Sequence, residues 1–152
     1  MMNNYSQKYW DDFWTGKEQP GSVCDWQFGF DPDGLAQLVI QGKKTATTSG
    51  YIFYELENEP LPITGLYNII LDGNDMPVAI TRNVDVQIMP MNMVTEVHAQ
   101  AEGEGDLSFE YWWNVHREFF TKELATLNMD FSDDMLVVCE RFELVDVYNQ
   151  TS

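Results

Sequence analysis

Residues 96–120 read EVHAQAEGEGDLSFEYWWNVHREFF, and this stretch decides how the rest of the chain is organised. Its middle places three carboxylates at alternate positions, Glu102, Glu104 and Asp106, separated by two glycines. Glycine breaks helices and permits tight turns, so the carboxylates are expected on a loop. Large aromatic side chains follow and are expected to anchor that loop. The pattern fits a loop that holds charge over a pocket, and equally a solvated acidic loop before an ordinary buried helix.

A helix is predicted to begin after Ser108, a favourable capping residue, and to continue to about Leu127. Trp112 and Phe119 are seven residues apart, so they share one face of this helix. We therefore interpret both side chains as mainly structural. Base stacking by an exposed Trp112 is the alternative interpretation.

Helical periodicity dominates the first third of the chain. Aromatic residues at helical spacing predict a helix over residues 5–14. Asp31-Pro32-Asp33 predicts the start of a second helix that ends near Gly42, and a third helix is expected over 50–57. Residues 16–25 are interpreted as a loop, and no regular element is assigned to the segment between the second and third helices.

The later part of the chain has the apolar alternation of strands. Two strands are predicted over 66–71 and 77–89, joined by a turn. A short helix is expected over 91–101, and one long strand or two over 135–148. This order of elements predicts a single compact domain of the α+β class. Because a sheet of few strands must hide its edges, we expect a small curved β-barrel rather than a flat sheet.

The charge of the chain is strongly acidic, with 25 acidic and 8 basic residues and a formal net charge of -17. Such a surface repels polyphosphate, which argues against long, non-specific nucleic-acid binding. Cys24 and Cys139 form no C-x-x-C motif and are interpreted as reduced thiols of a cytoplasmic protein. The N-terminal residues contain no apolar run typical of a signal peptide, and no membrane-spanning stretch is expected.

Gly42-Lys43-Lys44-Thr45-Ala46-Thr47 invites comparison with a phosphate-binding loop, but it lacks the preceding glycine and strand of that motif. A lysine and a threonine three residues apart can still face one cavity. A desolvated lysine there could lose its proton and activate the threonine hydroxyl. An exposed lysine beside a capping threonine is the alternative.

Metal binding is not predicted. His98 and His116 are 18 residues apart and lack the spacing of a zinc site. Glu102, Glu104 and Asp106 could supply oxygen ligands to Mg²⁺ or Ca²⁺, but their segment is not an EF-hand loop. We therefore expect no metal and no cofactor.

Four elements follow one another along the chain: Gly42-x-Lys44-x-x-Thr47, His98-Ala99-x-x-Glu102-Gly103-Glu104-Gly105-Asp106, Tyr111-Trp112 and the ending Val137-Val138-Cys139-Glu140-Arg141-Phe142-Glu143. In this order they resemble the ASCH family. The resemblance covers roughly residues 29–147, nearly the whole chain. It implies a PUA-like β-barrel with flanking helices over 29–148, preceded by an N-terminal helical extension over 1–28. ASCH proteins are thought to act on RNA or on nucleosides.

A shorter branch of this family removes the acetyl group from N4-acetylcytidine with a lysine, a threonine three residues later and a distant glutamate. The matching positions here are Lys44, Thr47 and Glu102. The resemblance implies that Lys44 acts as general base, Thr47 as nucleophile, and Glu102 as the group that orients substrate or water. This chain departs from that branch in its N-terminal extension and in the extra Glu-Gly-Asp after Glu102, which leaves the substrate open.

The pairing of Lys44 affects this mechanism. A carboxylate that directly contacts Lys44 stabilises the ammonium form. If Glu102 makes that contact, Lys44 is expected to stabilise an oxyanion rather than to remove a proton.

The expected partner is a small nucleoside or nucleotide, or a short RNA. Two other functions stay open. One is a non-catalytic RNA-binding module with a basic cleft around Lys43, Lys44 and Arg82. The other is a metal-dependent ribonuclease that uses the carboxylates of the acidic loop. We assign substrate binding to Lys43, Arg82, Glu104, Asp106 and Trp112.

Overall fold

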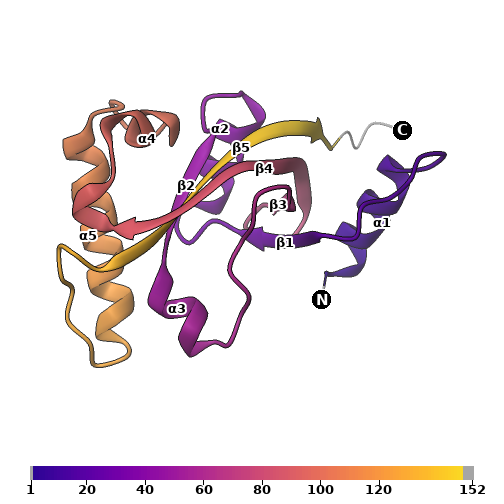
Figure 1. The fold of residues 1–152 in the computed structure, drawn as a ribbon. Helices are drawn as coiled ribbons and strands as arrows, with labels where there is room; N and C mark the ends of the chain where they lie inside the picture. The colour runs from indigo at the N-terminus through magenta and orange to yellow at the C-terminus, as the bar shows by residue number, and fades with distance from the viewer. Residues whose placement is uncertain (1, 149–152) are drawn as a thin grey trace.

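The computed structural model describes residues 2–148 of the chain, which form a curved five-stranded sheet with helices around it (Figure 1). The strands lie in the order β1-β3-β4-β5-β2. β1 runs parallel to β3, and every other neighbouring pair is antiparallel. The strands are β1 (Val23–Gln27), β2 (Ala46–Gly50), β3 (Tyr67–Leu71), β4 (Pro77–Pro90) and β5 (Leu136–Val147).

Five α-helices accompany this sheet within the described residues, so the predicted α+β class is confirmed. The helices are α1 (Asn4–Phe13), α2 (Pro32–Ile40), α3 (Tyr51–Leu56), α4 (Glu96–Ala101) and α5 (Phe109–Ala125). α1 lies at one end of the long β4–β5 pair, and α4 and α5 lie at the other end (Figure 1). Within residues 2–148, no helix combines the length and the apolar character that a membrane span requires.

The β4–β5 pair gives the sheet its curvature. β4 has 14 residues and β5 has 12, and their register shifts at two places, between Ile80 and Thr81 and between Asn83 and Asp85. An extra residue on one strand bends that strand and increases its twist. The small curved β-barrel predicted from the sequence is confirmed in the form of a curled half-barrel, and its curvature arises in the middle of the two longest strands.

The core lies on both faces of the sheet. Successive residues of a strand point to opposite faces, and β3 uses this alternation. Ile70 packs with residues of α2, whereas Ile69 packs with Tyr9 and Trp10 of α1. A third cluster joins α4 and α5 to the start of β5 through side chains that include Trp112. The N-terminal helix thus covers one face of the sheet.

Two of the five strands are missed by the sequence analysis. β1 begins at Val23, within a segment predicted as a loop, and β2 occupies residues 46–50, where no regular element is predicted. β2 has the sequence ATTSG, whose small and hydroxylated residues are typical of turns. Its extended form follows from antiparallel pairing with β5, because strand formation depends more on neighbours than on composition.

The predicted helix over residues 91–101 is also divided. A 3₁₀ turn covers Met91–Met93, and α4 begins only after Thr95, whose side chain accepts a hydrogen bond from the backbone N–H of His98. A threonine in extended conformation that caps the next helix separates the two pieces.

We propose that α1 folds as one unit with the rest of the chain, and Trp10 tests this. The Trp10 side chain is 2% exposed, and its replacement by alanine is expected to lower the free energy of unfolding by about 3–5 kcal/mol. Urea unfolding followed by circular dichroism should show one transition at a lower urea concentration. Tyr5→Ala is the matched control, because Tyr5 on the same helix is 62% exposed. An unchanged midpoint for Trp10→Ala would contradict the proposal.

Candidate active site

The acidic loop is pressed against the segment that precedes β2. Gly103 has a φ of 70°, and a Cβ atom there would lie 2.2 Å from the backbone oxygen of Lys43. The backbone N–H of Thr45 donates to the carbonyl oxygen of Ala101 at 2.7 Å. Only glycine combines this backbone conformation with so close an approach. The glycine between the two glutamates therefore brings both carboxylates to Lys44.

Lys44 lies at the centre of a buried charge cluster. Its Nζ is 2.7 Å from Glu104 Oε2, 3.1 Å from Glu102 Oε1 and 3.4 Å from the backbone oxygen of Glu102. Lys44 and Glu102 are each 1% exposed, and Glu104 is 8% exposed. An ammonium group has three protons to donate, and each finds an acceptor here. The Lys44 side chain therefore has three oxygen partners within the protein interior.

Glu102 is bound on its other side by a second set of donors. Its Oε2 accepts hydrogen bonds from the Thr48 hydroxyl at 2.7 Å and from the indole N–H of Trp112. Burial acts to raise the pKa of Glu102, but the charges of Lys44 and His116 outweigh it and hold that pKa well below its ordinary value. Glu102 is therefore ionised.

The two histidines beside Glu102 are oriented by their hydrogen-bond partners. His116 Nδ1 lies 2.8 Å from the backbone oxygen of Trp112, which can only accept, so Nδ1 carries a proton. Its Nε2 is 3.5 Å from Glu102 Oε2. Burial acts to lower the pKa of His116, but the charge of Glu102 prevails and raises it. Thr48 donates to Glu102 and so accepts from His98 Nε2, which is 2.8 Å away.

Glu104 makes the shorter contact with Lys44, yet its pKa moves in the opposite direction to that of Glu102. Burial raises the pKa of Glu104, and the charge of Glu102 adds to this effect while Lys44 opposes it. Glu102 has hydrogen-bond donors on both of its oxygens, whereas among the described side chains Lys44 alone donates to Glu104. We therefore place the stable negative charge of the cluster on Glu102.

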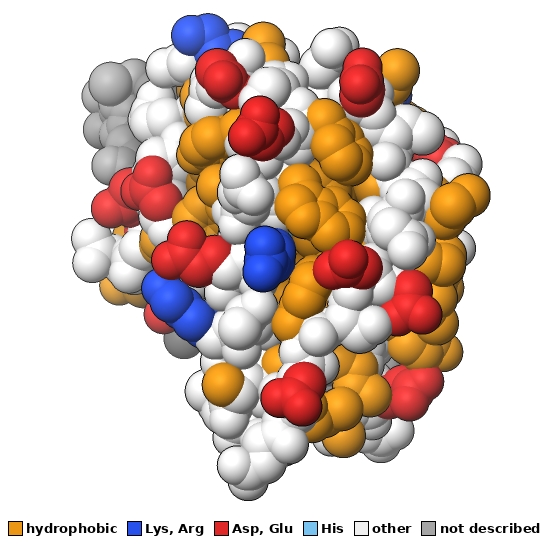
Figure 2. Space-filling view, turned by 90° about the vertical axis from the view of Figure 1, so that its left-hand side faces the viewer, with side chains coloured by type: hydrophobic (Ala, Val, Ile, Leu, Met, Phe, Trp, Pro, Cys, Tyr) orange, Lys and Arg blue, Asp and Glu red, His pale blue; other side chains and the backbone are white. Residues whose placement is uncertain are grey.

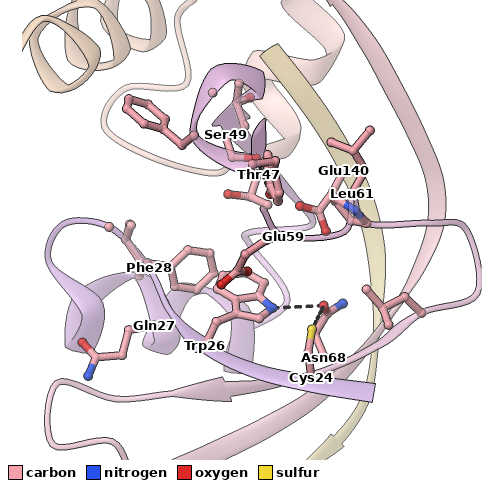
Figure 3. A pocket seen from close by; sticks show the side chains of 18 of the residues that line it. Cys24, Trp26, Gln27, Phe28, Thr47, Ser49, Glu59, Leu61, Asn68 and Glu140 are labelled. Carbon is pink, nitrogen blue, oxygen red and sulfur yellow. Dashed lines mark hydrogen bonds between the residues drawn. The ribbon is translucent and has the colours of Figure 1, made fainter. Parts of the chain in front are cut away.

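This cluster forms one wall of a cavity of about 690 Å³, a volume in the range of small-molecule sites. Thr47 and Ser49, which point the same way from β2, both line it. Trp26 and Phe28 contribute aromatic surface, with ring centroids 4.9 Å apart in a T-shaped arrangement (Figure 3).

A chain of hydrogen bonds supports another part of the cavity, and Figure 3 shows its first bond, from Trp26 to Asn68. The indole N–H of Trp26 donates to Asn68, the amide of Asn68 donates to Asn83, and the amide of Asn83 donates to Glu140 Oε2, each at 3.0 Å. Burial raises the pKa of Glu140 to about 7, with the hydrogen bond from Asn83 acting against it. Glu140 lies directly opposite Thr47 in the β2–β5 ladder.

The structure brings four of the predicted site residues together. Lys44, Thr47, Glu102 and Glu104 all line the cavity. The distances from Lys44 to Glu102 and Glu104 define the charge cluster. The catalytic and substrate-binding roles assigned to the four residues remain predictions.

The other four predicted substrate-binding residues do not line this cavity, which corrects their placement. Arg82 lies on the outer side of β4 and contacts Glu143, because Asn83 takes the inner position beside it. Lys43 is exposed, and Asp106 accepts from the backbone N–H of Ser108. Trp112 is buried and holds Glu102, in keeping with the structural role predicted for it.

Sequence reasoning missed four polar residues of the site, Thr48, His98, His116 and Glu140, as functional groups. Glu140 offered a signal, since it is a carboxylate within the apolar run that begins at Val137. Thr48 and His116 offered none, because their importance comes from Glu102, which reaches them only in the folded chain. His98 was part of the His98-Ala99 motif, but no role was assigned to it.

Lys43, Lys44 and Arg82 do not form the basic cleft considered for an RNA-binding module, because Lys44 is buried and neither Lys43 nor Arg82 lines the cavity. Lys8, Lys122 and Arg82 each contact an acidic side chain, and Lys44 is buried in its cluster. On the face shown in Figure 2, acidic side chains are spread widely, with few lysines or arginines among them. Within residues 2–148, no group of three or more His, Cys, Asp and Glu side chains is arranged to hold a metal ion.

Comparison with known proteins gives consistent matches. The family model described as ASCH domain matches residues 25–146, which confirms the resemblance noted in the sequence. The crystal structure of the ASCH domain from Lactobacillus crispatus JV V101 has a TM-score of 0.88 and 28% identity, covering 97% of both chains. The protein EF3133 from Enterococcus faecalis V583 has a TM-score of 0.80 and 43% identity, covering 96% of this chain and 88% of its own.

A more distant structure shows the fold alone. The ASCH protein from Zymomonas mobilis has a TM-score of 0.50 and 10% identity, over 84% of this chain and 72% of that one. The comparison with curated proteins found no match. The expected PUA-like fold is confirmed by the similarity to the ASCH domain structures.

Lys44→Met tests the charge cluster. Removing the ammonium leaves Glu102 buried without its main counter-charge, so the free energy of unfolding at pH 7 is expected to fall by about 3–5 kcal/mol. Lys122→Met is the matched control, because Lys122 and Glu118 form an exposed pair worth less than about 1 kcal/mol. Urea unfolding of both variants measures the difference. Equal effects of the two changes would show that the buried pair has no special importance.

Glu140→Gln tests the raised pKa of Glu140. Between the ordinary pKa of 4.5 and about 7, the folded chain binds more protons at this group than the unfolded chain does. Stability is therefore lost as pH rises through this window. The difference corresponds to about 3 kcal/mol. Glu140→Gln should be more stable than the wild type at pH 8 and lose that advantage at pH 4, as measured by thermal unfolding. A variant that is less stable at pH 8 would refute the assignment.

Proposed function

The chain belongs to the ASCH domain family, and we propose that its cavity is the active site of a hydrolase that acts on an acylated nucleoside. The proposed substrate class is an amide of the N4-acetylcytidine type. The reaction would be transfer of the acyl group to Thr47, followed by hydrolysis of the acyl-enzyme.

One observation carries this proposal: a buried ion cluster, Lys44 with Glu102 and Glu104, lines the same cavity as Thr47. Burying three ionisable groups costs several kcal/mol in desolvation and is a poor route to stability. Shifted carboxyl pKa values in a cavity are typical of functional sites, and the pKa values of Glu102 and Glu104 are shifted in opposite directions. The cluster is therefore better explained by chemistry in the cavity than by folding alone.

The geometry supports a charge role for Lys44 in place of the general-base role implied by the resemblance. Its three protons are donated to oxygens of Glu102 and Glu104, so it has no free electron pair with which to accept another. Its positive charge would favour the oxyanion that forms when a nucleophile adds to an acyl carbonyl. Glu102 would act as the positioning residue that holds Lys44, Thr48 and Trp112.

The cavity suits a small, planar ligand. Its volume accommodates a nucleoside, and Trp26 and Phe28 present aromatic surface on which a base can stack. The net charge of -17 and the pairing of the basic residues disfavour a long RNA. A metal-dependent ribonuclease is also less well supported, because Glu102 and Glu104 are already bonded to Lys44.

Hydrolysis of a panel of acylated nucleosides, with and without a chelator, tests the function. The wild type is expected to release the free acid and to be insensitive to the chelator. Thr47→Val removes the hydroxyl at nearly constant volume and should lower kcat/KM by at least about 10³-fold. Thr121→Val is the matched control, because Thr121 lies on α5 outside this cavity.

Three other outcomes of these assays would contradict the proposal or favour another function. No hydrolysis of any acylated nucleoside would contradict it. Chelator-sensitive cleavage of RNA would favour the ribonuclease. RNA binding that weakens steeply with salt, without hydrolysis, would favour the binding module.

A further inference from the structure

We propose that Glu140 is the general base that activates Thr47, and this inference rests on the hydrolase function proposed above. Thr47 of β2 and Glu140 of β5 are partners in the antiparallel ladder. Side chains directly opposite each other in such a pair share one face, with Cβ atoms about 4.5–5.5 Å apart. Both residues line the cavity, and Figure 3 shows both side chains pointing into it.

A base other than Lys44 or Glu102 is needed because both of these groups are fully engaged. A threonine hydroxyl is a weak nucleophile until a neighbouring group removes its proton. Lys44 donates all three of its protons to glutamate oxygens. Glu102 binds Lys44 through one oxygen and accepts from Thr48 and Trp112 through the other. Neither group is free to accept the proton of Thr47.

Glu140 has the free acceptor that these groups lack. Its Oε2 accepts from Asn83, and among residues 2–148 no side chain donates to its Oε1. Asn83 is itself held by Asn68, so the carboxylate has a fixed orientation. A base oriented by a third polar group and placed beside a hydroxyl is the arrangement that nucleophilic catalysis requires. Glu140 is only 5% exposed, and it lines the cavity in which a substrate would bind.

The surroundings of Glu140 suit a base that works near neutral pH. The titratable groups that face it are Cys24 of β1, Tyr54 of α3, Cys139 beside it on β5, and Glu59 across the cavity. Burial raises the pKa of Cys24 to about 11 and that of Tyr54 to about 12, so neither is charged at pH 7. Asn83 of β4 is uncharged, and from β2 the neighbour is Thr47. Burial raises the pKa of Glu140 itself to about 7, so both its charged and its neutral form are accessible near neutral pH.

The reaction balances with Glu140 as both base and acid. Its carboxylate takes the proton of the Thr47 hydroxyl as Oγ1 bonds to the acyl carbon. The tetrahedral intermediate then expels the amine, the C–N bond breaks, and protonated Glu140 returns the proton to the departing nitrogen. In the second stage Glu140 takes a proton from water, which attacks the ester on Thr47. The C–O bond to Thr47 breaks, Thr47 regains its proton, and the free acid leaves.

The test compares kcat/KM of the wild type and Glu140→Gln on N4-acetylcytidine from pH 5 to pH 9. Glutamine keeps the shape and an acceptor for Asn83 but cannot take a proton. We expect a loss of about 10²–10⁴-fold and the disappearance of the rise in rate centred near pH 7 that the wild type should show. Glu143→Gln is the matched control, because Glu143 is exposed on the same strand and contacts only Arg82 among the described basic side chains.

The outcomes separate this inference from the proposed function. Wild-type rates in Glu140→Gln, with Thr47→Val inactive, would overturn the role of Glu140 and leave the hydrolase intact. An equal loss at every pH, with the wild-type pH profile kept, would also overturn it and indicate a merely structural effect. An inactive wild type would overturn the function and this inference together. Thermal unfolding of each variant at the assay pH shows that lost activity is not lost folding.

Discussion

The contact between Lys44 and two glutamates of the acidic loop is the interaction on which the rest of the site depends. It joins residues that are 58 and 60 positions apart in the sequence. It also determines how the neighbouring groups behave. Because Lys44 neutralises Glu102, that carboxylate can remain ionised in the interior and accept from Trp112 and Thr48. Removing the ammonium would leave every one of these partners facing an uncompensated charge.

The same interaction explains why the two parts of the site differ in charge and in hydrogen bonding. One part, around Glu102, is saturated with hydrogen bonds and has a fixed charge. The other, around Glu140, has one polar partner and a pKa of about 7. Thr47 is on β2 between them, since its own strand carries Thr48 towards Glu102 and pairs with Glu140. Successive side chains of β2 point to opposite faces, so this short strand borders both groups. Thr48 faces the ionised Glu102, and Thr47 faces Glu140, which can exchange protons.

The sequence predicted the parts of the molecule that are determined locally. Asp31 and Ser108 cap helices within three residues of themselves, so α2 and α5 could be read from spacing. β2 could not, because ATTSG becomes a strand only through β5. The ordered motifs identified Lys44, Thr47 and Glu102, which line one cavity. Arg82 was misplaced because the face on which it lies depends on the two register shifts of β4 against β5, which no local pattern reveals.

The close packing of Gly103 against the backbone of Lys43 affects the order in which the parts of the chain fold. Until the loop docks there, Lys44, Glu102 and Glu104 are each hydrated, and burying any one of them alone is penalised. Contacts between segments so distant in sequence also form slowly, because a long loop must first close. The site is therefore completed late and all at once. A nascent or partly unfolded chain carries these residues but not the charge cluster, so the hydrolase activity proposed above would report on the fully folded molecule.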